Sequence, residues 1–135
     1  MARRLLDTSV LVAYWRHRRP PRINDATAED AGRWAEELIE QHNSRAIATP
    51  VSIEFLAGTR SGHELRLARS YLDRFEEIDQ GRITPDDWRQ ARHMAERIPP
   101  HGKPRQMGDC LIRAIAKRLN HEIVTLDQGL RRLKP

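Results

Sequence analysis

The chain has 135 residues with a mass of 15.7 kDa, and 39% of the residues are hydrophobic and 32% are charged. This length allows one modest hydrophobic core, so we expect a single domain over residues 1–135. No uncharged stretch approaches the roughly 18 residues of a membrane-spanning helix, and the single cysteine, Cys110, excludes an internal disulfide. The first residues lack the long apolar run and the cleavage site of a signal peptide, so we expect a cytoplasmic protein.

Basic charge is concentrated near the N-terminus. The chain carries 24 basic and 19 acidic residues, and residues 1–22 alone combine six arginines with one acid, which already gives the net charge of +5. Consecutive prolines break helices, so residues 16–22 are interpreted as an exposed loop. Arginine suits phosphate well, so this loop is a candidate contact for a polyanion, although an arginine-rich composition alone also explains it. Its arginines are Arg16, Arg18, Arg19 and Arg22.

The first half of the chain alternates strands and helices. Leu5-Leu6 is a short apolar run before Asp7 that indicates a buried strand, and residues 8–15 indicate a first helix. Residues 26–42 predict a second helix, because apolar residues recur there at intervals of three and four. Residues 46–49 indicate a strand, followed by a helix with Pro50 at its first position and Gly58 at its end. The apolar stripe of the second helix comprises Ala31, Trp34, Ala35, Leu38 and Ile39.

The second half continues this alternation. Helices are predicted over residues 64–75 and 85–98, the latter with Thr84 as its N-cap, and Glu77-Ile78-Asp79 indicates a brief strand between them. A proline-rich loop, residues 99–104, leads to a helix over 106–119, then a strand over 122–126 and a short helix after Asp127. The helix over 106–119 has an apolar stripe of Met107, Leu111, Ile112, Ile115 and Leu119. This order predicts an α/β fold, with a mainly parallel sheet of about four to five strands and helices on both faces.

Four acidic residues fall where such a fold gathers ligands, at the carboxyl ends of the strands. Asp7 and Asp127 directly follow predicted strands, Glu54 lies early in the helix after the second strand, and Asp109 lies in the first turn of the helix before the last strand. Glu54 has apolar neighbours and no basic residue three or four positions away, so its carboxylate needs a partner from elsewhere in the fold. We expect all four side chains to meet at one edge of the sheet.

Four carboxylates brought together repel one another and cannot all stay ionised without a cation. Mg²⁺ or Mn²⁺ prefers oxygen ligands, and one or two such ions can activate a water and stabilise the charge on a phosphodiester as it is cleaved. The sequence therefore favours hydrolysis of a nucleic-acid strand. The alternative is structural: Asp7 and Asp127 cap helices and Asp109 pairs with Arg113, which leaves a non-catalytic binding module.

The chain resembles PIN-domain ribonucleases, and most closely the VapC-type toxins of bacterial type II toxin–antitoxin pairs. The resemblance is carried by residues 5–9, 50–58, 108–116 and 124–127 and extends over nearly the whole chain. It implies a three-layer α/β/α domain in which the four acids are the catalytic and metal-binding residues. It also implies Ser9 and Thr125 as supporting hydroxyl groups.

The resemblance further implies an endoribonuclease that uses Mg²⁺ or Mn²⁺, with one or two ions, and cuts RNA as a toxin. Its implied partners are a cognate antitoxin that covers the metal site and a second copy of the chain in a homodimer. The arginines of residues 16–22 would then face RNA phosphates. Two alternatives remain open: a PIN nuclease for RNA maturation without a toxin role, and a non-catalytic RNA- or protein-binding module of the same fold.

Overall fold

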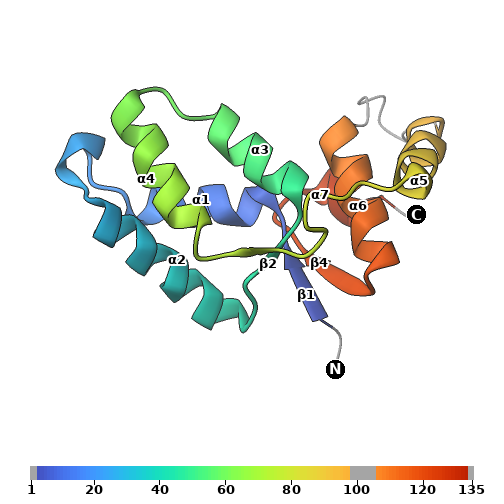
Figure 1. Ribbon diagram of the computed structural model, residues 1–135, viewed down its shortest axis with the longest axis horizontal. Coiled ribbons are helices and arrows are strands. Elements are labelled where there is room, and N and C mark those ends of the chain that lie inside the picture. The colour runs from blue at the N-terminus through green and yellow to red at the C-terminus, as the bar shows by residue number, and fades with distance from the viewer. Residues whose placement is uncertain (1–2, 98–105, 134–135) are drawn as a thin grey trace.

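The structure is a computed structural model that describes residues 3–97 and 106–133 (Figure 1). Strands and helices alternate along it, which confirms the predicted α/β class. The elements are β1 (Arg3–Leu6), α1 (Thr8–Arg18), the short 3₁₀ helix η1 (Ile23–Asp25), α2 (Ala28–His42), β2 (Ala46–Ile47), α3 (Thr49–Ala57), α4 (Gly62–Leu72), β3 (Glu76–Glu77), α5 (Pro85–Ala95), α6 (Met107–Arg118), β4 (His121–Val124) and α7 (Gln128–Arg132).

The strands of the described residues form two parallel pairs. β1 pairs with β4, with Leu6 opposite Val124, and β2 pairs with β3, with Ala46 opposite Glu76. β1 and β2 also lie side by side, and there the Ser44 hydroxyl group donates a hydrogen bond to the backbone oxygen of Arg4 at 2.6 Å. The strand order is thus β4-β1-β2-β3, with a side-chain bridge between the pairs in place of a continuous backbone ladder. Parallel pairing brings the carboxyl ends of the strands to one edge.

Helices cover the strands on both sides, which gives the three-layer arrangement (Figure 1). In the view of Figure 1, α1, α2 and α4 lie on one side of β1 and β4, and α5, α6 and α7 lie on the other. α2 packs on α4 and α5 packs on α6, while α3 contacts both α1 and α6. α3 and α6, which carry Glu54 and Asp109, are therefore in direct contact.

The core contains a cluster of aromatic rings between α1, α2, α3 and α4. Trp15 contacts the rings of Trp34, Phe55 and Tyr71 edge-on, at centroid distances of 5.4, 5.4 and 5.0 Å. The buried hydroxyl group of Tyr71 donates a hydrogen bond to the backbone oxygen of Leu11 at 2.9 Å. The apolar stripe predicted for the second helix is buried throughout.

Several expectations differ from the structure. α1 extends to Arg18, so Arg16, His17 and Arg18 belong to its last turn and not to an exposed loop. Pro20 restricts only the residue before it, which leaves residues up to 18 free to stay helical. In the predicted stripe of α6, Leu111, Ile112 and Ile115 are buried. Met107, the first residue of the helix, is 70% exposed, and Leu119, just after its last residue, is half-buried.

Several elements have other bounds than the sequence predicts. α5 ends at Ala95 and not at residue 98, and α4 covers Gly62–Leu72 and not residues 64–75. β3 covers Glu76–Glu77 and not residues 77–79, and β4 covers His121–Val124 and not residues 122–126. The proline-rich loop predicted over residues 99–104 lies outside the described residues. Among the helices of residues 3–97 and 106–133, none combines the length and the apolar character needed to cross a bilayer.

Candidate metal centre

Asp7 lies directly after β1 as the N-cap residue of α1 and is only 3% exposed. The hydroxyl groups of Ser9 and Thr125 donate hydrogen bonds to its Oδ2 atom at 2.8 and 2.7 Å. Its Oδ1 atom receives no hydrogen bond from the residues that the structure describes. One oxygen of this carboxylate is therefore held in place by protein donors.

Ser9 and Thr125 connect the two ends of the described chain. Their hydroxyl oxygens lie 3.1 Å apart, and each also accepts a backbone hydrogen bond from the segment after β4. The Leu126 amide donates to Ser9 at 2.9 Å, and the Asp127 amide donates to Thr125 at 2.9 Å. The structure thus places both predicted supporting residues against Asp7, where they hold the start of α1 to the segment that contains Asp127.

Glu54, on α3, finds its partner on α1. The Thr8 hydroxyl group donates a hydrogen bond to its Oε1 atom at 2.8 Å. Its Oε2 atom lies against Gly108, where an added Cβ atom would approach it to 2.8 Å. Burial raises the pKa of Glu54 above its ordinary value; the hydrogen bond from Thr8 opposes this rise and the negative charge of Asp7 adds to it. The side chain therefore reaches the first turn of α6, directly beside Asp109.

Asp109 is affected by the negative charges of the other three acids. Burial raises its pKa to about 6, and the negative charges of Asp127, Asp7 and Glu54 contribute, in that order. The pairing with Arg113 considered from the sequence is not formed: Arg113 donates instead to the backbone oxygen of Leu130 at 2.9 Å. Asp109 thus lies among like charges.

Asp127 is exposed and caps α7, since its Oδ1 atom accepts hydrogen bonds from the amides of Gly129 at 2.7 Å and Leu130 at 3.3 Å. The capping roles considered for Asp7 and Asp127 are therefore real. Capping does not explain Glu54 or Asp109, because neither caps the helix that carries it. Helix capping therefore leaves the positions of Glu54 and Asp109 unexplained.

The donor set fits a hard cation such as Mg²⁺ or Mn²⁺, because it consists of carboxylates supported by hydroxyl groups. Within the described parts of the chain, no three acidic, histidine or cysteine side chains stand close enough to hold an ion between them as they are placed. Mg²⁺ is commonly held by only one or two carboxylates and keeps several waters, so this looser cluster still suits it.

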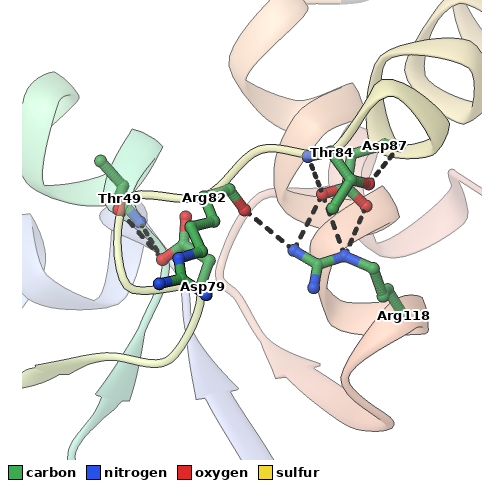
Figure 2. Close-up of polar contacts among 6 residues, drawn as sticks. All are labelled: Thr49, Asp79, Arg82, Thr84, Asp87 and Arg118. Carbon is green, nitrogen blue, oxygen red and sulfur yellow. Dashed lines mark hydrogen bonds and ion pairs between the residues drawn. The ribbon is translucent and has the colours of Figure 1, made fainter.

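A loop of residues 79–84 holds α3 and α6 relative to each other (Figure 2). At one end Asp79, which is 4% exposed, accepts hydrogen bonds from the amide and hydroxyl groups of Thr49 at the start of α3. At the other end Arg118, in the last turn of α6, donates to the backbone oxygen of Arg82 at 3.0 Å and to both carboxylate oxygens of buried Asp87. The loop of residues 79–84 thus links α3, which carries Glu54, to α6, which carries Asp109.

Sequence reasoning missed Asp79. The sequence does offer one signal, at the helix start Ala48-Thr49-Pro50. Ala48, the N-cap residue, has no side-chain acceptor, so a cap must come from another segment. Nothing in the spacing of the sequence identifies which residue provides it.

The four arginines proposed as RNA contacts lie in different settings. Arg18 forms an ion pair with Glu37 at 2.9 Å, and Arg19 forms one with Glu64 at 3.3 Å. Arg16 and Arg22 are exposed. The structure therefore separates two arginines that bind within the chain from two that face solvent.

Residues 4–134 match the PIN domain family, and the chain belongs to this family. No individually curated protein matches the chain. PIN domains are generally metal-dependent nucleases. The fold and the acidic edge described above agree with that chemistry.

Proposed function

We propose that the chain is an endoribonuclease that uses a divalent metal ion, and that it acts as the toxin of a toxin–antitoxin pair. The observation that carries the proposal is that Asp7, Glu54 and Asp127, from three other segments, lie near enough to Asp109 for their charges to raise its pKa. A bound cation would balance the repulsion between these carboxylates when they are ionised. A cation held in this way can also activate a water and stabilise the charge that develops during phosphodiester hydrolysis.

The four acidic residues would have different roles in metal binding. Asp7, through its Oδ1 atom, Asp109 and Glu54 would hold one or two Mg²⁺ or Mn²⁺ ions. Asp127, whose Oδ1 atom already accepts two amide hydrogen bonds, would act through water. The bound ion supplies an activated water and stabilises the charge that develops on the phosphodiester.

The remaining polar groups keep the site in place. Ser9 and Thr125 hold the Asp7 carboxylate in one orientation through its Oδ2 atom. Thr8 orients Glu54 from the first turn of α1. Positioning by such hydrogen bonds lowers the cost of reorganising the site during the reaction.

Cleavage of RNA by purified protein in the presence of Mg²⁺ tests the proposed activity. Asp7→Asn or Asp109→Asn should reduce cleavage by orders of magnitude, whereas Asp25→Asn, which changes an exposed aspartate of η1, should not. Equal cleavage by the parent and the Asp7 variant would contradict the site assignment.

The toxin role is supported by the resemblance of residues 5–9, 50–58, 108–116 and 124–127 to VapC-type toxins. It implies a cytoplasmic homodimer inhibited by a cognate antitoxin. Induced expression in cells separates this role from RNA maturation: a toxin should arrest growth, and a co-expressed antitoxin gene should restore it. Unimpaired growth under strong expression of active enzyme favours the maturation nuclease.

A non-catalytic binding module of the same fold makes a different prediction. An ion that binds only the folded protein raises its melting temperature in a saturable manner. Acids that serve only as helix caps predict no such effect of Mn²⁺. A melting temperature independent of Mn²⁺ therefore favours the binding module.

A further inference from the structure

A cleft of about 260 Å³ opens beside the acidic site, between α1, α3 and the turn that precedes α4. Glu54 lines this cleft and also belongs to the acidic cluster, so the two are continuous. Three arginines, Arg16, Arg19 and Arg60, line it as well, together with Glu64. A strongly basic wall therefore adjoins the carboxylates.

Glu64 organises this wall. It is a charged residue with only 8% exposure, and its Oε1 atom accepts a hydrogen bond from the backbone amide of Arg60 at 2.8 Å. Its Oε2 atom accepts one from the guanidinium group of Arg19 at 3.3 Å. Glu64 thus neutralises Arg19 and fixes the backbone from which the Arg60 side chain extends.

Arg16 and Arg60 are left with their charges unbalanced. Both are exposed, and neither forms an ion pair within the described parts of the chain. Arg18, by contrast, lies on the same helix as Arg16 but is paired with Glu37. The cleft therefore presents two guanidinium groups to a ligand, and planar guanidinium groups bind phosphate in a bidentate manner.

We propose that this cleft binds the backbone of a single-stranded RNA segment next to the bond that is cleaved, with Arg16 and Arg60 as phosphate ligands. The proposal rests on the proposed ribonuclease function and specifies how its substrate is held. Arg16 follows Thr8 by eight residues, which is about 12 Å along a helix at 1.5 Å per residue. We therefore assign Arg16 to a phosphate further along the strand and not to the scissile phosphate itself.

The size of the cleft favours single-stranded over double-stranded RNA. Its volume suits a segment of one unpaired strand, whereas an A-form duplex presents its phosphates on a broad surface. Trp15 and Phe55 line the floor but are only 5% and 6% exposed, too little for a base to stack on them. Recognition here is thus of the backbone and independent of the base at this position.

The test uses Arg16→Gln and Arg60→Gln in an Asp7→Asn background, so that RNA is bound without being cut. The matched control is Arg3→Gln, an exposed arginine that lines a separate cleft of about 600 Å³ at the amino ends of β1 and β4. Binding of a labelled single-stranded RNA is measured by fluorescence anisotropy at several salt concentrations. Far-UV circular dichroism and melting curves check that each variant folds.

We expect each cleft variant to weaken RNA binding about tenfold, the effect of losing a charged hydrogen bond. The slope of log affinity against log salt concentration should fall in magnitude by about 0.7 for each RNA phosphate that the variant no longer neutralises. Arg3→Gln should leave both quantities unchanged. Arg60→Lys, which keeps the charge but not the fork, should recover part of the affinity.

The outcomes separate this proposal from the proposed function. RNA affinity that is unchanged in both cleft variants overturns the cleft assignment, even if the parent protein cleaves RNA. Loss of antitoxin binding with unchanged RNA affinity also overturns it and makes the cleft a protein-docking site. Reduced RNA affinity in both variants supports the cleft, and if the parent then cuts no RNA in Mg²⁺, only the ribonuclease proposal fails.

Discussion

Asp79 caps helix α3 through two hydrogen bonds from Thr49, one from its amide and one from its hydroxyl group, each 3.0 Å long. The two residues are 30 positions apart, so the cap comes from the loop after β3 and not from the helix's own N-cap residue, Ala48. Because α3 carries Glu54, this contact fixes the helix that presents Glu54 to the other acids.

Asp79→Ala should lower the free energy of unfolding by about 1–2 kcal/mol, the usual effect of losing a helix cap, as measured by urea denaturation. It should also reduce the stabilisation by Mn²⁺, because α3 is then less firmly placed. Asp79→Asn keeps an acceptor oxygen and should recover most of the stability. Asp86→Ala, which removes an exposed aspartate that forms an ion pair with Arg89, is the matched control and should change stability little.

Gly108→Ala tests the contact between α6 and Glu54. The new methyl group would lie 2.8 Å from the Oε2 atom of Glu54, so this carboxylate must move. Alanine favours helix over glycine by about 1 kcal/mol, so we expect the fold to stay stable while the Mn²⁺-induced rise in melting temperature falls. Gly62→Ala, where the nearest atom is the flexible end of Arg66 at 3.7 Å, is the control. A full Mn²⁺ response in Gly108→Ala contradicts a metal role for Glu54.

The stability of the metal-free protein should depend on the ionisation of Asp109. Its pKa is about 6 in the folded state against an ordinary value of 3.8, so the folded state binds this proton more tightly than the unfolded state does. The stabilising contribution is complete below pH 3.8 and is lost as the pH rises through 6. In EDTA, the melting temperature should therefore fall between pH 5 and 7 by more in the parent than in Asp109→Asn.

Burial and the charge of Arg4 lower the pKa of His42, so the titration of His42 makes stability rise with pH, opposite to the effect of Asp109. His42 is present in both proteins, so the comparison with Asp109→Asn cancels its contribution. Adding Mn²⁺ at pH 7 should restore the melting temperature of the parent protein. Parallel pH profiles for the two proteins would show that Asp109 does not lie among like charges.

Thr125→Val tests the hydroxyl groups that hold Asp7. Thr125 is buried, and its hydroxyl group donates to Asp7 at 2.7 Å and accepts from the amide of Asp127 at 2.9 Å. Leaving these partners unsatisfied should cost about 1–3 kcal/mol of stability by urea denaturation. Thr125→Ser retains the hydroxyl group and should behave more like the parent protein. An equal destabilisation in both variants would assign the effect to the methyl group.

Periodicity and capping signals predicted most of the fold. The stripe of α2 is regular and fully buried, and Thr84 is the N-cap that the sequence indicated at the start of α5, where Asp87 completes a capping box. The strand before Asp7 was recognisable because Leu5 and Leu6 are apolar on both faces, as a buried parallel strand requires. These features depend on neighbours within a few residues.

Contacts between distant segments could not be read in the same way. Arg18 and Arg19 are adjacent in the sequence, yet their partners, Glu37 and Glu64, lie on different helices. The arginine-rich segment therefore indicated phosphate contacts for residues whose charges are already balanced. The order of the four acids predicts one edge of a sheet for a different reason, because parallel strands place their carboxyl ends together.

The pairing of β1 with β4, and the hydrogen bond from Thr125 to Asp7 across 118 residues, has a consequence for how the chain folds. Contacts between such remote segments form slowly, since a long loop must close before they stabilise anything. Ser9 can reach Asp7 from within the same helical turn, but Thr125 can reach it only once β1 and β4 have paired. Full orientation of the Asp7 carboxylate therefore requires that the chain has closed on itself, which makes Mn²⁺ binding a test of long-range order in the fold.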